Sequence, residues 1–219
     1  MEENSTSAIG KIEIIMLVPF WQRFTTFAAW GALVGLVFFI VYPSTNWLAG
    51  LRGNALSLFF TWELRLPLVP QFVWFYLSMY VLFALPPFFL PPGALKKLAK
   101  GLITTTCLAG VFFLVVPARL GFPRTAPSDS PYRQIFTSLF AIDLPFNLVP
   151  SLHVVYSTAI VLAIAARLGG LSRVMLFVWL ALLCTSTILV HQHHLLDVFT
   201  GLALALLVHF YWERREKHA

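Results

Sequence analysis

Six long stretches without a charged side chain dominate this sequence of 219 residues. They cover residues 24–51, 66–95, 101–118, 144–166, 174–196 and 198–212. A helix needs about 20 consecutive apolar residues to cross the hydrocarbon core of a bilayer, and five of the stretches reach or approach that length. The sequence therefore predicts an all-α integral membrane protein, built as a bundle of six transmembrane helices.

The sixth stretch is too short to span unless its helix begins near Leu195, which would carry Asp197 into the membrane boundary. The alternative is that this segment does not span. An aspartate inside the membrane costs roughly 2.5 to 3.5 kcal/mol on insertion scales, so its presence favours a functional role. Only 11% of the residues are charged, against about 25% in soluble domains, which excludes an ordinary soluble enzyme.

The chain reads as one membrane domain over residues 24–212, between an N-terminal segment, 1–23, and a basic tail, 213–219. The N-terminal segment lacks the basic start and the small-residue cleavage site of a secretory signal, so we expect it to be retained at the cytoplasmic interface. Cys107 and Cys184 fall inside apolar stretches, where neither a disulfide nor a metal finger is expected.

Basic residues are distributed unevenly between the two sides of the predicted bundle. Six alternating spans put Arg52, Arg65, Arg119, Arg124 and Arg133 on one side, and the other ten of the 15 lysines and arginines on the side of the termini. The positive-inside rule then predicts cytoplasmic termini, and we expect a bacterial cytoplasmic membrane. Because these cations are dispersed over membrane loops, the net charge of +6 indicates no nucleic-acid partner.

Unusual polar residues gather at the predicted external ends of the helices. In the first cluster, Arg119 and Arg124 lie in a proline-containing loop and can grip phosphate oxygens. In the second, we expect Pro150 at the first position of a helix, with Ser151 and His153 beside an anion bound at its N-terminus. The alternative is a simple helix start followed by an interfacial histidine.

The third cluster covers residues 186–197 and contains His193 and Asp197, four positions apart. On a helix these two side chains would share a face, and the carboxylate could orient the imidazole so that its other nitrogen serves as nucleophile or base. His191, His193 and His194 could instead bind a metal, but Asp197 is the only carboxylate nearby. We therefore expect no metal at these histidines.

Taken together, the three clusters resemble the type-2 phosphatidic acid phosphatase superfamily, whose motifs are K-x6-R-P, P-S-G-H and S-R-x5-H-x3-D. The order of the motifs is the same here. The matching residues are Arg124 for the first motif, Pro150, Ser151 and His153 for the second, and Ser186, His193 and Asp197 for the third. The resemblance covers nearly the whole chain from about residue 24 and implies a six-helix membrane bundle.

The resemblance also implies a role for each matching residue. His193 would attack phosphorus to form a phosphohistidine, Asp197 would orient it, and His153 would protonate the leaving alkoxide. Arg124 and Ser151 would hold the phosphoryl oxygens, where phosphoryl transfer gains most of its stabilisation. Arg119 and Ser186 complete the set of candidate phosphate-binding residues. The mechanism that the resemblance implies requires neither a metal nor an organic cofactor.

Four positions depart from the family motifs: Pro117, Thr125, Leu152 and Thr187 stand where a lysine, a proline, a glycine and an arginine belong. Two expected cations are therefore missing, and Arg119, or His191 if protonated, are the candidates to replace them. The P-S-L-H form and the missing arginine are more similar to the inositol-phosphorylceramide synthase and sphingomyelin synthase branch, which transfers phospho-headgroups between lipids.

We therefore expect a membrane lipid phosphatase that acts at the external face on a phosphorylated lipid. The alternative enzyme is a phosphotransferase that passes the phospho-headgroup to an alcohol or lipid acceptor. A third hypothesis, motivated by the missing cations, is a non-catalytic transporter or scaffold. The sequence determines neither the lipid nor the oligomeric state.

Overall fold

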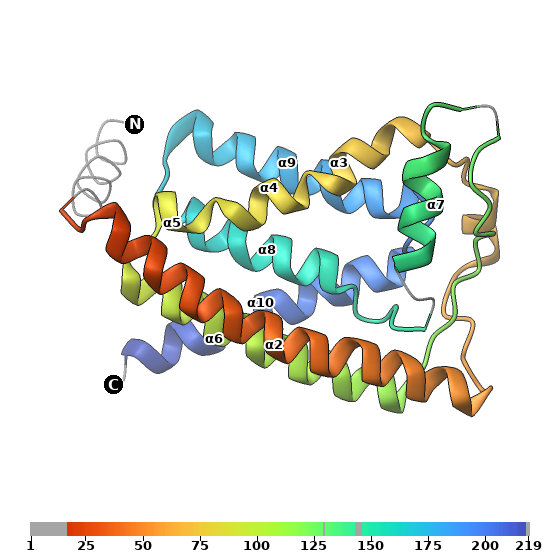
Figure 1. Cartoon of the computed structure of the whole chain (residues 1–219), viewed down its shortest axis with the longest axis horizontal. Helices are drawn as coiled ribbons and strands as arrows, with labels where there is room; N and C mark the ends of the chain where they lie inside the picture. The colour runs from red at the N-terminus through yellow and green to blue at the C-terminus, as the bar shows by residue number, and fades with distance from the viewer. Residues whose placement is uncertain (1–16, 129, 143–145, 218–219) are drawn as a thin grey trace.

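The computed structural model describes residues 17–128, 130–142 and 146–217, and in this part of the chain the regular secondary structure is helical throughout (Figure 1). The long helices are α2 (Phe20–Arg52), α6 (Pro92–Val115), α9 (Gly170–Leu189) and α10 (Leu195–Lys217). The shorter elements are η1 (Thr61–Arg65), η2 (Pro70–Phe72), α3 (Val73–Leu77), α4 (Met79–Ala84), α5 (Pro86–Phe89), α7 (Arg133–Ile142) and α8 (Leu152–Ala165).

Four of these helices, α2, α6, α9 and α10, are long and apolar enough to cross a membrane. The expected all-helical membrane protein is thus confirmed, whereas the expected count of six spanning helices is not. The helix of the sixth stretch begins at Leu195, as predicted, and includes Asp197 in its first turn. The second and fourth stretches form shorter helices instead.

The second stretch is broken into η2, α3, α4 and α5. Proline lacks a backbone N–H and restricts the residue before it, and the pair Pro86 and Pro87 opens α5. Pro91 and Pro92 then close the segment, because α5 ends at Phe89 and α6 begins at Pro92. The second uncharged stretch therefore ends as a helix before Pro91.

Helix α8 lies in the middle of the bundle, between α3–α4 on one side and α6 and α10 on the other (Figure 1). Its 14 residues rise about 21 Å, which is less than the roughly 30 Å hydrocarbon thickness. Ten of them are buried, so protein surrounds the helix rather than lipid, and its length need not match the bilayer. Gly201 on α10 allows α10 to pack closely against the start of α8, since a Cβ at this position would lie 2.8 Å from the Ser151 carbonyl oxygen.

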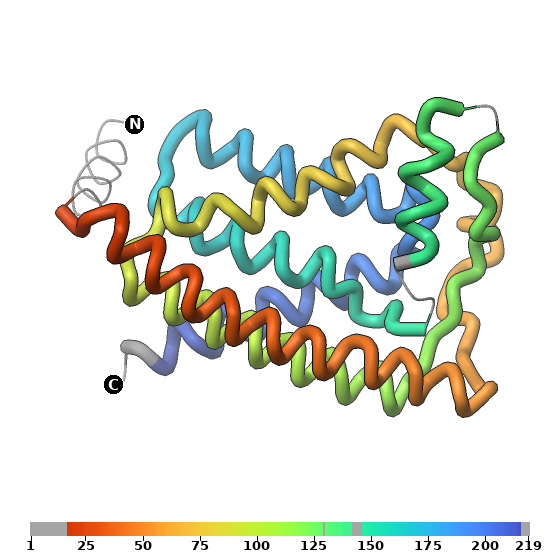
Figure 2. The backbone as a smooth tube through the Cα atoms, viewed as in Figure 1, coloured from red at the N-terminus to blue at the C-terminus, as the bar shows by residue number. Residues whose placement is uncertain are grey.

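The two ends of the bundle differ in construction (Figure 2). One, here named the terminal end, carries the start of α2 and the close of α10, together with the α5–α6 and α8–α9 junctions. The other, the loop end, carries residues 53–72, 116–128 and 130–142. Between the third and fourth uncharged stretches, the structure contains the unpredicted helix α7, which buries Phe136 completely and leaves Arg133 exposed.

Candidate active site

Four side chains near the loop end form a continuous line of hydrogen-bonding contacts. The Asp197 Oδ2 atom lies 3.1 Å from His193 Nδ1, and His193 Nε2 lies 3.0 Å from His153 Nδ1. The other ring nitrogen of His153, Nε2, lies 2.8 Å from the Tyr76 hydroxyl. The line thus joins residues from α10, from the turn before it, from α8 and from α3.

One set of tautomers satisfies the whole line. A carboxylate only accepts, so His193 carries its proton on Nδ1 and donates it to Asp197, which leaves Nε2 with a lone pair. That lone pair accepts from His153 Nδ1–H, so His153 Nε2 accepts from the Tyr76 hydroxyl. The nucleophile-competent nitrogen of His193 therefore faces His153.

The contact between His193 and Asp197 arises differently from the prediction. His193 precedes α10 and lies in the turn that follows α9, where its backbone N–H donates to the Thr187 carbonyl at 3.0 Å. Asp197 is the third residue of α10, and its Oδ2 also accepts from the His194 backbone N–H at 2.8 Å, as in a capping box. The prediction that His193 and Asp197 lie on one face of the same helix is wrong, but their side chains are in contact.

Glu63, which is not among the site residues predicted from the sequence, supports this turn. Its side chain is fully buried in η1, where its carboxylate accepts from the backbone N–H groups of Phe60 and Leu195 at 2.8 and 2.9 Å. Oε2 also lies 3.3 Å from His194 Nδ1. Because Leu195 begins α10, Glu63 holds the helix that carries Asp197.

His194 and His191 are packed among aromatic rings. Phe122 stacks between them, with centroid distances of 4.5 Å to His194 and 4.1 Å to His191, and Phe59 covers the other face of His194 at 4.5 Å. The Gly121 N–H donates to His194 Nε2, so the proton of that ring is on Nδ1, facing Glu63.

Burial lowers the pKa of both His191 and His194 below the ordinary value of a histidine. His191 is therefore neutral at pH 7 and does not replace a missing cation. Among the residues that the structure describes, no group of three His, Cys, Asp or Glu side chains could hold a metal ion.

Arg124 is brought to the residue next to His193. One of its terminal nitrogens lies 3.5 Å from Gln192 Oε1, and its guanidinium lies 5.4 Å from the centroid of the Phe140 ring. Within the described residues, the Arg124 Nε and Gln192 Nε2 atoms are buried without a hydrogen-bond partner. Two buried donors without acceptors thus lie on Arg124 and on the residue that precedes His193, and a phosphoryl group has the oxygens to satisfy them.

The other candidate phosphate ligands serve different purposes. Arg119 is exposed, and its Nε donates to the Ser57 hydroxyl at 2.9 Å. The Ser186 hydroxyl donates to the Leu183 carbonyl within α9.

At the start of α8, Ser151 is the N-cap, and its hydroxyl accepts from the Val154 N–H at 3.4 Å. Pro150 precedes this cap, so its predicted place at the first helical position is wrong. The Ser151 N–H donates to the Asp197 carbonyl at 3.0 Å, which ties the start of α8 to the first turn of α10.

An apolar groove of about 570 Å³ extends to His153, one member of the histidine pair that His153 and His193 form. Its walls come from α2, α4, α6 and α8, and Tyr76 and His153 contribute polar groups to its lining. Phe39 and Tyr80, on the α2 and α4 walls, are strongly exposed, so the groove opens at the surface of the bundle between these helices.

Comparison of the chain with protein-family models, with curated proteins and with solved structures finds no match.

Proposed function

We propose that this protein is an integral membrane phosphatase that hydrolyses a phosphorylated lipid through a phosphohistidine on His193. The observation that carries the proposal is the continuous line from Asp197 through His193 and His153 to Tyr76. It supplies an oriented nucleophile and, directly opposite, a second histidine that can transfer a proton.

The first half-reaction needs the phosphoryl group to enter between the two imidazoles, where it replaces their direct hydrogen bond. His153 is doubly protonated beside the phosphate dianion, with Nε2–H donated to the Tyr76 oxygen. His193 Nε2 attacks phosphorus, the bond from phosphorus to the lipid oxygen breaks, and the His153 Nδ1 proton passes to that oxygen. Asp197 stabilises the positive charge that develops on His193.

In the second half-reaction water replaces the departed lipid alcohol. His153, now neutral at Nδ1, takes a proton from the water as it attacks phosphorus. The bond from phosphorus to His193 Nε2 breaks, and inorganic phosphate leaves. No described contact favours an alcohol over water as the acceptor, so hydrolysis is the reaction proposed.

The buried, unpartnered donors of Arg124 and Gln192 support binding of the phosphoryl oxygens. Gln192 thereby adds a neutral donor next to Arg124, the arginine that matches the first motif, while positions 117 and 187 carry no cation. Preorganised donors aimed at developing charge are usually the largest contribution to phosphoryl transfer.

The apolar groove supports a lipid substrate. Its lining is formed mostly by aromatic and aliphatic side chains, and its polar contribution includes Tyr76 and His153. A lipid whose chain lies in the groove would present its headgroup phosphate to the histidine pair. A soluble phosphate ester would leave this apolar surface unused.

We also propose that the chain crosses the membrane six times, with α3–α5 and α8 as the two short crossings, of which α8 is enclosed by the other helices. The first residues of α2 and the last of α10 lie at the same end, as an even number of crossings requires (Figure 1). The positive-inside rule makes this terminal end cytoplasmic and puts the histidine pair toward the external face.

The test is phosphate release from lipid monophosphates in detergent micelles, with trapping of an acid-labile, base-stable phosphoenzyme. His193→Ala should abolish both signals while the protein still purifies folded. His218→Ala, the same change in the C-terminal tail, is the matched control and should keep both. Undiminished turnover in His193→Ala would overturn the proposal, and new phospholipid products would redirect it to phosphotransfer.

A further inference from the structure

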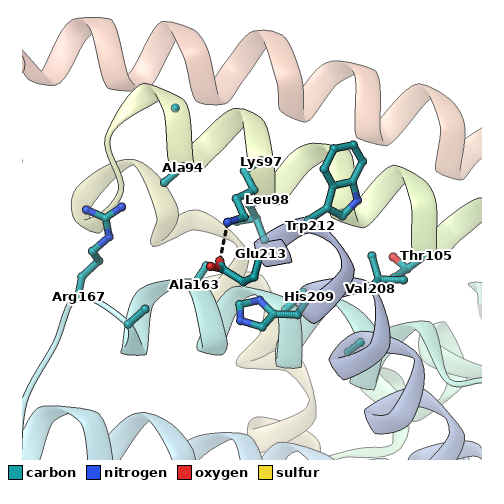
Figure 3. Close-up of a pocket in the computed structure, with 15 residues that line it drawn as sticks. Ala94, Lys97, Leu98, Thr105, Ala163, Arg167, Val208, His209, Trp212 and Glu213 are labelled. Carbon is teal, nitrogen blue, oxygen red and sulfur yellow. Dashed lines mark hydrogen bonds and ion pairs between the residues drawn. The ribbon is translucent and has the colours of Figure 1, made fainter. Parts of the chain in front are cut away.

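A second pocket, of about 280 Å³, lies at the terminal end of the bundle, between α6, α8 and α10 (Figure 3). It is distinct from the groove that reaches His153. The histidine pair belongs to the first turn of α8 and the turn before α10, and these parts of the chain lie toward the opposite end. Small side chains make room for it on each helix: Gly101 on α6, Ala163 on α8 and Ala205 on α10. Its volume is near the lower limit of small-molecule sites, roughly 300 to 1,000 Å³.

The polar lining of this pocket carries an excess of positive charge. Lys97 on α6 pairs with Glu213 on α10, with 2.5 Å between Nζ and Oε1. Arg167, which follows α8, also lines the pocket, and among the described residues its guanidinium has neither an ion-pair nor a hydrogen-bond partner. In Figure 3, Lys97 extends toward Glu213, and Arg167 stands to one side of this pair.

Trp212 stands on the other side of the pair (Figure 3). Its indole nitrogen is buried, and within the described part of the chain it has no acceptor. Buried donors in native proteins nearly always find a partner, so this N–H points to an acceptor from outside the chain. Lys100 and Arg215 lie over the Trp212 ring, 5.7 and 5.6 Å from its centroid, and add positive charge around it.

We propose that this pocket binds a phosphate-bearing anion, namely the headgroup of an anionic phospholipid from the leaflet at the terminal end. The phosphate would accept from Arg167 and Lys97, and the ester oxygens of the glycerol would accept from the Trp212 indole N–H. A lipid headgroup offers acceptors along its length, which suits donors placed on both sides of the Lys97–Glu213 pair. Basic pockets between helices on the cytoplasmic side are a recognised setting for such lipids.

This site does not depend on the proposed phosphatase activity, because it uses neither the histidine pair nor Phe39 and Tyr80 at the opening of the groove. It would make the protein responsive to the anionic lipid content of one leaflet. Binding there would link α6, α8 and α10 through one ligand. A bound lipid therefore stabilises the folded chain by mass action, whether or not the chain turns over a substrate.

The test is native mass spectrometry of the full chain in detergent with phosphatidylglycerol, phosphatidylcholine or inorganic phosphate, each added separately. The wild-type protein should retain one phosphatidylglycerol more tightly than phosphatidylcholine. Arg167→Gln should weaken this binding by roughly tenfold or more, the scale expected for lost charge-assisted hydrogen bonds. Ala163→Leu should fill the pocket and weaken it without changing any charge.

The matched control is Arg173→Gln, which removes an exposed arginine near the start of α9 that does not line the pocket. It should bind like the wild type. Arg167-dependent binding of inorganic phosphate as strong as that of the lipid would support the same anion chemistry with a free ion as its source. Equal retention of the two lipids, or equal binding by Arg167→Gln and Arg173→Gln, would overturn the proposal.

Discussion

Glu63 and His194 are in contact although 131 positions separate them, with 3.3 Å between Oε2 and Nδ1. The same carboxylate oxygen holds the Leu195 N–H at the beginning of α10. The segment after α2 is thereby fastened to the turn that carries His193. Glu63 has no access to solvent, so the contact is a fixed part of the interior.

Replacing this carboxylate should loosen the turn. Glu63→Gln puts an amide N–H₂ group where an acceptor is needed, so one backbone N–H loses its partner. Leaving a buried group unsatisfied costs about 1 to 3 kcal/mol. We expect a lower unfolding midpoint in detergent, together with a lower turnover number.

The matched change for this experiment is Glu213→Gln, at a half-exposed ion pair with Lys97. Such pairs contribute about 0 to 1 kcal/mol, so its unfolding midpoint should move less. Equal midpoints for the two variants would contradict the positioning role of Glu63.

Tyr76 holds the outer nitrogen of His153. Tyr76→Phe removes the oxygen that lies 2.8 Å from Nε2, so His153 loses both its orientation and its proton partner. Because positioned acid–base groups contribute about 10² to 10⁴ in rate, we expect kcat to fall by about one to two orders of magnitude with little change in KM.

Steady-state kinetics over a range of pH measure this effect, and the pH profile should change shape because the proton-transfer group is altered. Tyr211→Phe removes an exposed hydroxyl at the terminal end and should retain wild-type kinetics. A KM increase at constant kcat in Tyr76→Phe would assign the hydroxyl to substrate binding instead.

The two candidate arginines of the first cluster should behave differently. Arg124→Gln removes the cation beside Gln192, and loss of a transition-state donor costs about 10²- to 10³-fold in kcat. Arg119→Gln removes an exposed side chain that contacts Ser57, so its rate should change by less than about twofold. Phosphate-release rates of the two variants decide between them, and a larger loss in Arg119→Gln would reverse the assignment.

The buried histidines next to the candidate active site predict sensitivity to acid. Burial lowers the pKa of His191 below 6.5, so protons bind the unfolded chain more readily than the folded one. Stability is therefore full above about pH 6.5 and falls as the pH drops from there toward the lower folded pKa. Unfolding midpoints between pH 7.5 and 5 should show this decline.

His191→Asn removes one titrating group and suits the backbone, because His191 has a φ of 58° and asparagine tolerates that region. The decline in stability below pH 6.5 should be shallower in this variant. An identical decline would show that His191 does not contribute to it.

The sequence predicted the helical membrane character because uncharged stretches of spanning length carry that signal directly. It also selected His153, His193 and Asp197, which the structure brings together. The spacing of His193 and Asp197 was informative even though the helix begins only at Leu195, because a capping carboxylate in the first turn reaches back over the same few residues.

Glu63 and Tyr76 could not be found in this way. Each is a single polar residue far in sequence from its partner, and no local spacing marks it. The length of α8 could not be predicted either, because an apolar stretch has the same sequence pattern whether lipid or protein surrounds the helix. The buried donors of Arg124 and Gln192 depend on a loop whose path the sequence does not encode locally.

Because the groove opens sideways between α2 and α4, the proposed enzyme would respond to the concentration of lipid in the membrane surface rather than in the bulk solution. A lipid could slide in from the bilayer without leaving the hydrocarbon, so encounters would occur by diffusion in two dimensions. The rate would then follow the mole fraction of substrate in the surface, and inert detergent or lipid would slow turnover at constant bulk substrate. For such an enzyme, a change in the lipid composition of the membrane would change the turnover rate even when the total amount of substrate stays the same.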